Sequence, residues 1–428
     1  MASRTDTTRT DRTLDFLRRG YAFSDAWRRE LGAVDPRSVA RIPLRLLGGR
    51  ALLVRGDEGV RLFYDTSRVK RHGAMPLPVR GPLFGAGAVH GLDDDEHRHR
   101  KAMFVSLAYD DSQVARLLPL VEEQWRLAVD RWQREGSGDV YDTAVLAYGR
   151  AVMTWAGIDV AETEQDVWAR RLAQIVDGFG ALGPQHLLAW VNRARCDRWA
   201  ASLVRRTRAG ELQPPEGTAL RVVSEHRDLQ GRLLDEHTAG VELQNVVRPT
   251  IAVSRFAAFA ALALRENAWW APRLAAEAEE RGTLAGGREA TAFAEEVRRV
   301  YPFVPMLPSI AREDFTWEDQ QIKAGDRILI DVVGTNLDER HWDSPRTFDP
   351  RRFLDVDRES VEHFIPQGGG DVRTGHRCPG EKIAVTCLAV TVAALSRPGV
   401  ELETGGLEYS WTVMPTRPDS GVRVSVKA

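Results

Sequence analysis

The sequence has few cysteines, no long apolar run and almost no net charge. Its 428 residues include three cysteines, Cys196, Cys378 and Cys387, and no C-x-x-C pair. This spacing argues against a disulfide framework and against a structural zinc site. The 59 basic and 61 acidic residues leave a formal charge of −2, so no global attraction to nucleic acid is expected. No apolar stretch approaches the ~20 residues of a membrane helix, and the polar N-terminus does not resemble a signal peptide. We therefore expect a cytoplasmic protein without integral membrane association.

The pattern along the chain indicates a mainly α fold. Between about 94 and 300, apolar residues recur at spacings of three and four, which is typical of helices. The stretch 50–65 reads as two short strands around a turn, and further strands are expected at 326–333 and near the C-terminus. We find no linker that would divide the chain. The sequence therefore predicts one domain over 1–428, a large helical body with small β-sheets near both ends, and a disordered tail at 1–12.

Residues 243–264, LQNVVRPTIAVSRFAAFAALAL, look like a buried helix, yet Arg248 and Pro249 lie inside it. A proline in a helix interior removes a backbone hydrogen bond and costs roughly 3 kcal/mol. An arginine in an apolar run needs an anion or a route to water. A carboxylate that accepts two hydrogen bonds is the best geometric match for a guanidinium. The alternative is that Arg248 reaches water or pairs with a structural acid.

The strongest chemical signal is Cys378, within FIPQGGGDVRTGHRCPGEKIAVTCLAV. Pro379 and Gly380 let the backbone turn tightly after it, so that amides can face the sulfur, and the following helix N-terminus stabilises a thiolate. Such a thiolate is a metal ligand or a nucleophile, while the alternative is a buried free cysteine in a turn. No partner motif for a nucleophile stands out in the sequence. Ligation of a haem iron therefore fits better.

Two motifs upstream of the cysteine loop narrow the assignment. Glu296 and Arg299 stand three residues apart in FAEEVRRVYPF, and Arg352 follows in FDPRRF. Glu and Arg at this spacing share a helix face, and a second arginine could close a buried charge network. In this order, with the Cys378 loop after them, the motifs resemble the cytochrome P-450 superfamily. The resemblance implies the cytochrome P-450 fold and haem b with Cys378 as axial ligand, supported by the Glu-Arg-Arg triad.

The chain departs from the common superfamily pattern in two places. Asp371 and Thr374 stand where the usual loop has an aromatic residue and a glycine. The central helix lacks the acid–alcohol pair that relays protons to dioxygen, since it offers Arg248-Pro249, and Thr250 has no acidic neighbour. With LFGAGAVHGLDDDEHRHRK, ELQNVVRP, EVRRVYPF and IPQGGGDVRTGHRCPGE, the chain resembles bacterial peroxide-using fatty-acid cytochromes P-450 over nearly its whole length.

That resemblance implies a role for the arginine on the central helix. In this subgroup it grips the carboxylate of a fatty acid above the haem, which would be the task of Arg248, and Pro249 would bend the helix to make room. The bound carboxylate would serve as general base and general acid toward hydrogen peroxide, the co-substrate. Anchoring the acid places its α and β carbons nearest the reaction. The implied products are 2- and 3-hydroxy fatty acids, or terminal alkenes formed by oxidative decarboxylation, without an obligatory redox partner.

The remaining candidate residues are assigned by the same resemblance. His90, with Phe84 six residues before it, matches alkene-forming relatives near the haem, although hydroxylases also carry histidine there, and a plain loop histidine is the alternative. Phe303 and Met306 would line the acyl tunnel, unless they are ordinary core residues. The basic run 97–101 is either a solvated helix face or part of the haem pocket. The residues implied to meet the haem propionates are His97, Arg100, Arg71 and His376.

Two other functions remain open from the sequence. A conventional reductase-dependent cytochrome P-450 monooxygenase would need the acid–alcohol pair, which we do not find. A non-catalytic haem sensor or carrier would have no use for an arginine poised to bind a carboxylate. The sequence therefore favours a peroxide-using enzyme that acts on long-chain fatty acids.

Overall fold

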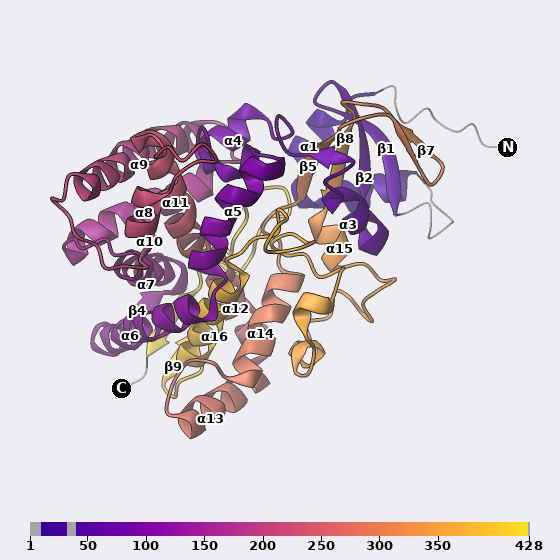
Figure 1. Cartoon of the computed structure of the whole chain (residues 1–428). Coiled ribbons are helices and arrows are strands. Elements are labelled where there is room, and N and C mark those ends of the chain that lie inside the picture. The colour runs from indigo at the N-terminus through magenta and orange to yellow at the C-terminus, as the bar shows by residue number, and fades with distance from the viewer. Residues whose placement is uncertain (1–9, 32–39, 427–428) are drawn as a thin grey trace.

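Helices make up most of the computed structural model, which describes residues 10–31 and 40–426 (Figure 1). The region from 94 to 300 is almost entirely helical, as its residue spacing predicted. The mainly α class is thus confirmed. The helices of this region are α5 (Asp94–Ala108), α6 (Asp111–Glu135), α7 (Val140–Trp155), α8 (Glu162–Gly178), α9 (Pro184–Arg208), α10 (Ala219–Glu225), α11 (Glu236–Ala252), α12 (Ser254–Glu266), η3 (Ala268–Trp270), α13 (Ala271–Arg281) and α14 (Arg288–Val300).

Shorter helices precede and follow this region, and one long helix comes after the cysteine loop. The N-terminal helical spacing is interrupted at Gly20, where a 3-10 turn separates two α-helices. These helices are α1 (Thr13–Arg19), η1 (Gly20–Ala22), α2 (Phe23–Glu30), α3 (Gly56–Tyr64), α4 (Leu77–Phe84), η2 (Val89–Gly91), α15 (Val332–Asn336), η4 (Pro350–Phe353), η5 (Arg358–Ser360) and α16 (Glu381–Leu395).

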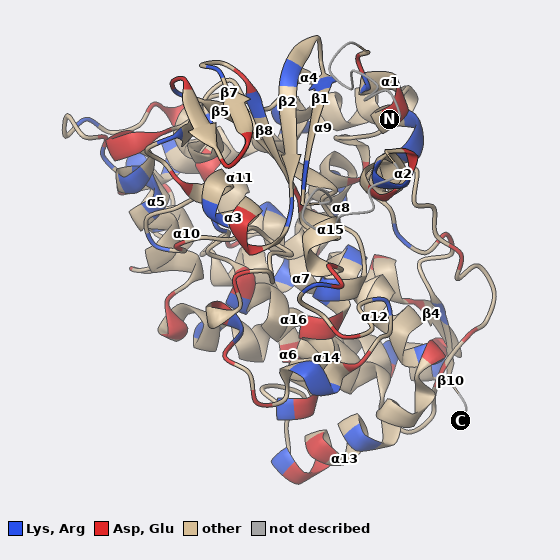
Figure 2. Cartoon of the chain, turned by 90° about the vertical axis from the view of Figure 1, so that its right-hand side faces the viewer, with Lys and Arg blue, Asp and Glu red and all other residues tan. Residues whose placement is uncertain are grey.

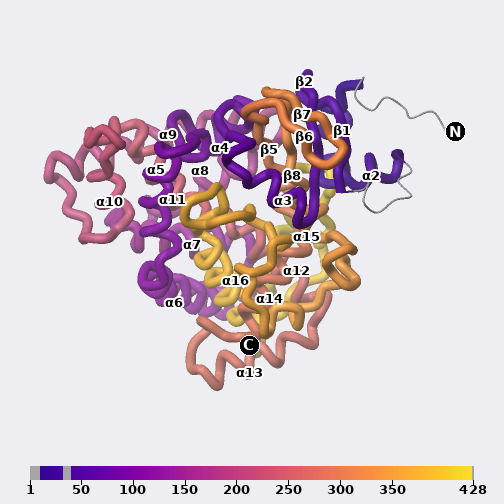
Figure 3. The backbone as a smooth tube through the Cα atoms, turned by 45° about the vertical axis from the view of Figure 1, so that its right-hand side comes forward, coloured from indigo at the N-terminus to yellow at the C-terminus, as the bar shows by residue number. Residues whose placement is uncertain are grey.

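The first strand expected within 50–65 and the strand expected at 326–333 are neighbours in one five-stranded sheet, with the order β1-β2-β8-β5-β3, while the strand expected near the C-terminus lies in a second sheet. Strand β2 runs parallel to β8, with Val54 opposite Ile330, and the other neighbours are antiparallel. Figure 3 shows the orange β5 and β8 beside the indigo β1 and β2. The sheet therefore fastens the first part of the chain to the part after 300. Its strands are β1 (Arg41–Leu46), β2 (Gly49–Val54), β3 (Val69–Lys70), β5 (Met306–Ala311) and β8 (Arg327–Asp331).

Two smaller sheets complete the strands of the described residues. One has the order β4-β10-β9 and packs on the far end of the helical body, where Val424 is fully buried in the main core. The other is the hairpin of β6 and β7. Their strands are β4 (Ser137–Asp139), β9 (Val400–Leu402), β10 (Arg423–Val426), β6 (Phe315–Trp317) and β7 (Gln320–Ile322).

The prediction of two strands within 50–65 was wrong in its second half. Strand β2 is followed by helix α3, because Gly56, with φ of 72°, turns the chain out of the sheet. Asp57 then lies in the first helical turn, where a negative charge is favourable. Val60 and Phe63 are buried on one face. The alternation of apolar residues in VRLFY imitates a strand, but the helical spacing decides.

The predicted tail at 1–12 is partly corrected. Residues 1–9 lie outside the described part of the chain, but Asp11 forms a bridge with Arg45. The N–H of Arg12 donates to the carbonyl of Arg45 at 2.9 Å. The chain is therefore attached to the edge of the sheet just before α1.

The predicted buried helix at 243–264 is present as α11 and α12, which meet at Val253. The continuous segment Glu236–Glu266 is long and apolar enough to cross a membrane by composition, but 94% of its most apolar window is buried inside the protein. It is packed as a core helix is. Pro249 lies in the last turn of α11, so the helix ends within one turn of the missing N–H.

Acidic and basic residues are interleaved over the helices and around the sheet in Figure 2. Many of them form pairs, such as Arg273 with Glu289 between α13 and α14. Neither sign gathers on one face in this view, in keeping with the small net charge.

Candidate active site

Cys378 stands three residues before α16, at the end of the glycine-rich loop. Its N–H donates to the carbonyl of Gln367 at 3.2 Å, and Nε2 of Gln367 lies 3.9 Å from Sγ. Burial, and then Glu381, raise the pKa of Cys378, while the Gly380 N–H and Lys101 lower it. A backbone amide thus faces the sulfur, as predicted. Because burial dominates, the protein alone favours the thiol, and a bound metal cation would be needed to hold the thiolate.

The structure brings together the three residues of the predicted charge network behind this loop. Glu296 accepts two hydrogen bonds from Arg299, both of 2.7 Å, and Arg352 Nε lies 3.6 Å from the same carboxylate. Arg299 also donates to the carbonyls of Pro345 and Asn336, at 2.7 Å and 3.1 Å. Arg299 and Glu296 are buried, so this pair is held in a low-dielectric interior.

A second charge network, which sequence reasoning missed, surrounds the cysteine itself. Arg298 contacts Glu295, and its Nη2 lies 3.1 Å from Glu381 Oε2. Glu381 in turn accepts from Arg377, at 2.8 Å and 3.2 Å. Because Arg377 precedes Cys378 and Glu381 follows it by three residues, the network braces both sides of the sulfur. The signal was present, since EEVRR contains two overlapping E-x-x-R pairs and only one was used.

A cluster of basic side chains lies beside the cysteine loop. The rings of His97 and His376 stack with centroids 3.8 Å apart. Lys101 donates to the carbonyl of Arg377, next to the cysteine. The guanidinium of Arg71 lies over Phe63, 3.8 Å from the ring centroid, and its buried Nη1 has no partner among the described residues.

The surroundings of this cluster disfavour positive charge. Burial lowers the pKa of Arg71 to about 10, of Lys101 to about 8 and of His97 to about 4, and it also lowers the pKa of His376. Asp93 is the acid that partly offsets the shift for Arg71 and His97. An anion bound here would relieve the deficit. The implied haem carries two propionate carboxylates and an iron for Cys378, so the residues present fit that group.

Arg248 is buried in α11, with 4% of its surface exposed. Its Nη2 donates to Asn245 Oδ1 at 2.9 Å, while its buried Nε has no partner among the described residues. Burial, and then the nearby Arg193, lower its pKa to about 9. The side chain therefore neither pairs with a structural acid of the described residues nor reaches water, and the two alternatives raised from the sequence lose their support.

His90 and Phe84 lie next to Arg248 and line a cavity of about 220 Å³. Their rings stack with centroids 3.9 Å apart and planes 18° apart, and the Arg248 guanidinium carbon is 5.9 Å from the Phe84 centroid. Burial, and then Arg248, lower the pKa of His90 well below its ordinary value, so the imidazole is neutral. Arg71 and His376 line the same cavity, so it extends from Phe84 and His90 to the basic cluster.

Glu242 and Asn245, three residues apart on α11, fasten the His90 loop to the central helix. Glu242 accepts from the Val89 N–H at 2.9 Å and from Arg100 at 2.8 Å. Asn245 donates to the carbonyl of Phe84 at 3.0 Å. The sequence did contain a signal for this role, because these two polar residues share one face of an otherwise apolar helix. Arg100 is thus engaged by Glu242, and we leave it out of the proposed haem contacts.

Phe303 and Met306 are half-buried and pack against the core, and neither lines the cavity. Phe303 packs on Phe256, with ring centroids 5.3 Å apart, and Met306 packs against the core cluster under β1. Their neighbours in β5, Leu307 and Pro308, line the cavity. The assignment of both residues to the acyl tunnel therefore stays a prediction.

Comparison with known proteins found a family model and a curated protein that are similar to this chain. A family model described as cytochrome P-450 matches residues 290–397, which hold both E-x-x-R pairs and the cysteine loop. "Putative cytochrome P-450 137" of Mycobacterium tuberculosis is 24% identical over 413 residues, covering 91% of this chain and 80% of that protein.

Solved structures are similar over almost the whole chain. Cytochrome P-450SP alpha (CYP152B1) in complex with (R)-ibuprophen has a TM-score of 0.88 and 35% identity, covering 97% of this chain and 98% of that one. Ligand-free cytochrome P-450 OleT has a TM-score of 0.89 and 30% identity, covering 97% and 96%. A variant of OleT in complex with arachidonic acid has a TM-score of 0.88.

The buried charge network yields a prediction about stability. Arg299→Ala leaves the Glu296 carboxylate buried without its main partner, so the free energy of unfolding should fall by about 3–5 kcal/mol. The exposed pair of Arg273 and Glu289 has similar bonds, of 2.8 Å and 2.7 Å. Arg273→Ala should therefore cost only ~0–1 kcal/mol. Urea denaturation of both variants measures the difference, and equal losses would contradict the network's importance.

The basic cluster yields a prediction about acid stability. The pKa of His97 is about 4 in the folded protein and 6.5 in its ordinary state. The unfolded chain therefore takes up the proton first, so the stability that neutral His97 contributes is complete above 6.5 and is lost as the pH falls toward 4. Glutamine does not titrate, so the free energy of unfolding of His97→Gln should fall less between pH 6.5 and 4 than that of the unmodified protein. Urea denaturation of the haem-free proteins measures this difference.

Bound haem should reduce the same loss in the unmodified protein, because carboxylates beside His97 would raise its pKa. If the free energy of unfolding depended on pH in the same way in the protein and in His97→Gln, the view that the basic cluster lacks an anion would be contradicted.

Proposed function

Because the chain belongs to the cytochrome P-450 family, we propose that it is a haem-thiolate enzyme that oxidises long-chain fatty acids with hydrogen peroxide. Oxidation falls on the α and β carbons and gives terminal alkenes by oxidative decarboxylation, 2- and 3-hydroxy fatty acids, or both. The similarity to OleT, one structure of which holds the fatty acid arachidonic acid, supports this choice of substrate.

The observation that carries the proposal is the guanidinium of Arg248, which has no acidic partner among the described residues. It is buried, its Nε lacks an acceptor among the described residues, and it lies beside the cavity that His90 and Phe84 line. A carboxylate would accept from Nε and from the neighbouring Nη, in the two-bond geometry that guanidinium groups prefer. The acyl chain would leave toward the apolar lining formed by Phe63 and Leu307.

Four residues would hold the haem. Cys378 would ligate its iron, and Arg71, His97 and His376 would bind its propionate carboxylates. The bound haem supplies the iron at which hydrogen peroxide is activated, with the thiolate favouring O–O cleavage. Glu296, Arg299 and Arg352 keep the loop behind it in place, together with the second network around Arg298.

The chain's own residues position the substrate and control its proton. Asn245 fixes the guanidinium of Arg248, which binds the carboxylate and thereby places the α and β carbons nearest the reaction. The bound carboxylate takes the peroxide proton and returns it, as general base and then general acid. Pro249 leaves the carbonyl of Asn245 without its usual helical donor, so the backbone can open toward the cavity.

The alternatives receive less support. Thr250 is buried and has no acid–alcohol pairing, so a reductase-dependent monooxygenase lacks its proton relay. Since hydrogen peroxide supplies both oxygen and electrons, we propose that no redox partner is obligatory. A non-catalytic haem carrier would leave Arg248 without a task. We further propose a single domain over 1–428, because strands from the first part of the chain and from the part after 300 share one sheet, and a cytoplasmic protein without integral membrane association.

Loss of the guanidinium tests the substrate and the mechanism together. In Arg248→Ala, affinity for a fatty acid, read from the shift of the haem absorption spectrum, should fall on the order of 10- to 100-fold, as loss of hydrogen bonds to a charged group implies. Peroxide-driven product should disappear with it. The exposed Arg265→Ala is the matched control and should behave as the unmodified protein. Undiminished product in Arg248→Ala, or turnover only with a reductase system, would overturn the proposal.

The neutral imidazole of His90 is expected to influence the product. His90→Gln should raise the ratio of hydroxy acid to alkene, because the ring stacked on Phe84 stands beside the anchored head group. Gas chromatography with mass spectrometry gives the ratio after reaction with peroxide. Phe84→Leu keeps the imidazole but removes its stacking partner, so a smaller change is expected. An unchanged ratio in His90→Gln would make it a lining residue only.

A further inference from the structure

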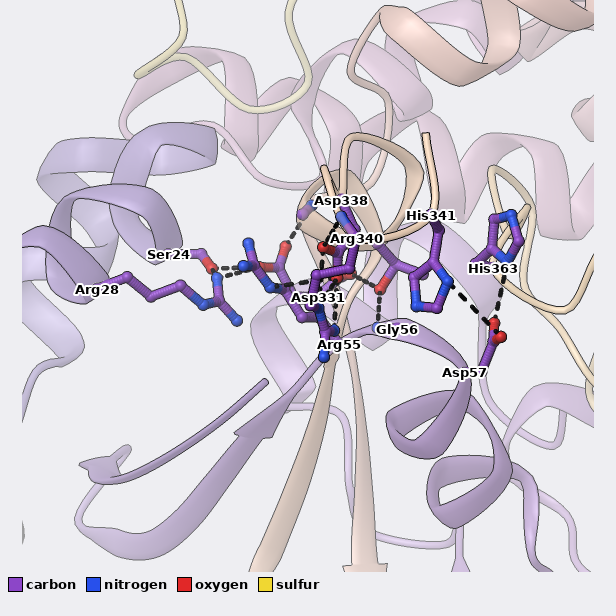
Figure 4. Close-up of polar contacts among 12 residues, drawn as sticks. Ser24, Arg28, Arg55, Gly56, Asp57, Asp331, Asp338, Arg340, His341 and His363 are labelled. Carbon is purple, nitrogen blue, oxygen red and sulfur yellow. Dashed lines mark hydrogen bonds and ion pairs between the residues drawn. The ribbon is translucent and has the colours of Figure 1, made fainter. Parts of the chain in front are cut away.

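Three side chains from distant parts of the chain converge at the start of α3, beyond the end of β2 (Figure 4). Asp57 lies in the first turn of α3, His341 in the loop after α15, and His363 just before the glycine-rich loop. One ligand atom from each lies within 4.8 Å of the others. Asp57 Oδ1 is 3.0 Å from Nδ1 of His363, and its Oδ2 is 3.8 Å from Nδ1 of His341.

We propose that Asp57, His341 and His363 form a binding site for a divalent transition-metal ion of the zinc type. Bonds from zinc to imidazole and carboxylate are about 2.0–2.2 Å, so neighbouring ligand atoms of a tetrahedral site lie roughly 3.3 Å apart. The separations of 3.0 Å and 3.8 Å, which join the two imidazoles to different oxygens of Asp57, lie on either side of this value. Small side-chain adjustments would therefore complete three ligands, with a fourth position for water. This proposal is independent of the proposed peroxygenase function.

The rings are already held in the orientation that ligation requires. His341 and His363 stack with centroids 4.5 Å apart and planes only 14° apart, and both turn Nδ1 toward Asp57 (Figure 4). Trp342 packs edge-on against His363, at 5.0 Å. An open hollow of about 440 Å³, lined by Asp57 and His363 among others, adjoins the group and admits an ion with its water.

The local charges also suit a cation. Arg340 is the arginine beside the group, but it is bound by Asp338 at 2.6 Å and 3.1 Å, while Glu58 adds negative charge next to Asp57. Arg352 at the rim of the hollow is engaged by Glu296. Burial lowers the pKa of His363, so its imidazole is neutral at physiological pH, which is the form that binds metals.

A simple hydrogen bond does not account for the whole arrangement. It explains His363 and Asp57, but His341 Nδ1, at 3.8 Å, is beyond hydrogen-bond distance. Its buried Nε2 has no partner among the described residues. A Cβ at Gly56 would crowd both Arg340 and that Nε2, which would lie 3.1 Å away. The ring of His341 stacks on His363 but has no hydrogen bond among the described residues.

A bound ion would tie α3 to the segment that leads into the cysteine loop. His363 is two residues before Ile365, whose N–H donates to Asn336 Oδ1 at 2.8 Å. An ion that binds the folded chain and not the unfolded one raises the midpoint of thermal unfolding. The ion would thus link the start of α3 to the segment just before the cysteine loop.

Isothermal titration of the haem-loaded, tag-free protein with zinc chloride tests the site. Haem must be present, because the stacked His97 and His376 would otherwise offer a competing pair. We expect one ion per chain and a higher thermal midpoint. His363→Gln and Asp57→Asn should weaken binding by about tenfold or more, as loss of a ligand implies.

His237→Gln, at an exposed histidine on α11, is the matched control and should bind zinc normally. His341→Gln is the second test variant, because it removes a ligand without removing a hydrogen bond to Asp57. An unchanged haem absorption spectrum establishes that each variant is folded. The proposal is overturned if the unmodified protein takes up no stoichiometric zinc, or if the His341 and His363 variants bind it as tightly as the control.

Discussion

A buried guanidinium needs an anion, and this requirement organises the interior of the protein. Arg299 pairs with Glu296, and Arg298 contacts both Glu295 and Glu381. Both arginines therefore support the loop that carries the cysteine. Arg248 is treated differently, because α11 gives it an amide from Asn245 and no acid of the described residues. The same physical rule therefore separates the groups that support the site from the group that awaits a ligand.

The contrast is sharpest within one helix. Glu242 and Arg248 are both buried in α11, yet Glu242 is occupied by Arg100 and by the Val89 N–H. Its contacts attach the loop before α5 to the central helix and hold His90 near the guanidinium. If Glu242 paired with Arg248 instead, it would neutralise the charge of the guanidinium, and the site would have no affinity for a substrate carboxylate. Arg100 thus has a part in the site after all, by keeping that acid engaged elsewhere.

Part of the site could be predicted from short sequence motifs. The rest depends on contacts between residues that are far apart in the sequence. Cys378, Glu296 and Arg248 could be identified from the sequence because each lies in a short pattern whose chemistry is unusual. Helix α3 was mistaken for a strand because VRLFY alternates like one, and only packing reveals that Val60 and Phe63 share a face. The group formed by Asp57, His341 and His363 spans about three quarters of the chain, so no spacing rule could have indicated it.

Among the described residues, no second base lies near the proposed position of the substrate's carboxylate, and this links binding to reactivity. His90 is a poor proton acceptor, because burial and the charge of Arg248 lower its pKa, and Glu242 is committed to other donors. If the substrate's own carboxylate is the group that moves the peroxide proton, a ligand without one loses both its anchor and its base. Selectivity for acids then follows from the mechanism itself, because a neutral molecule of the same shape could fill the cavity and still leave peroxide unactivated.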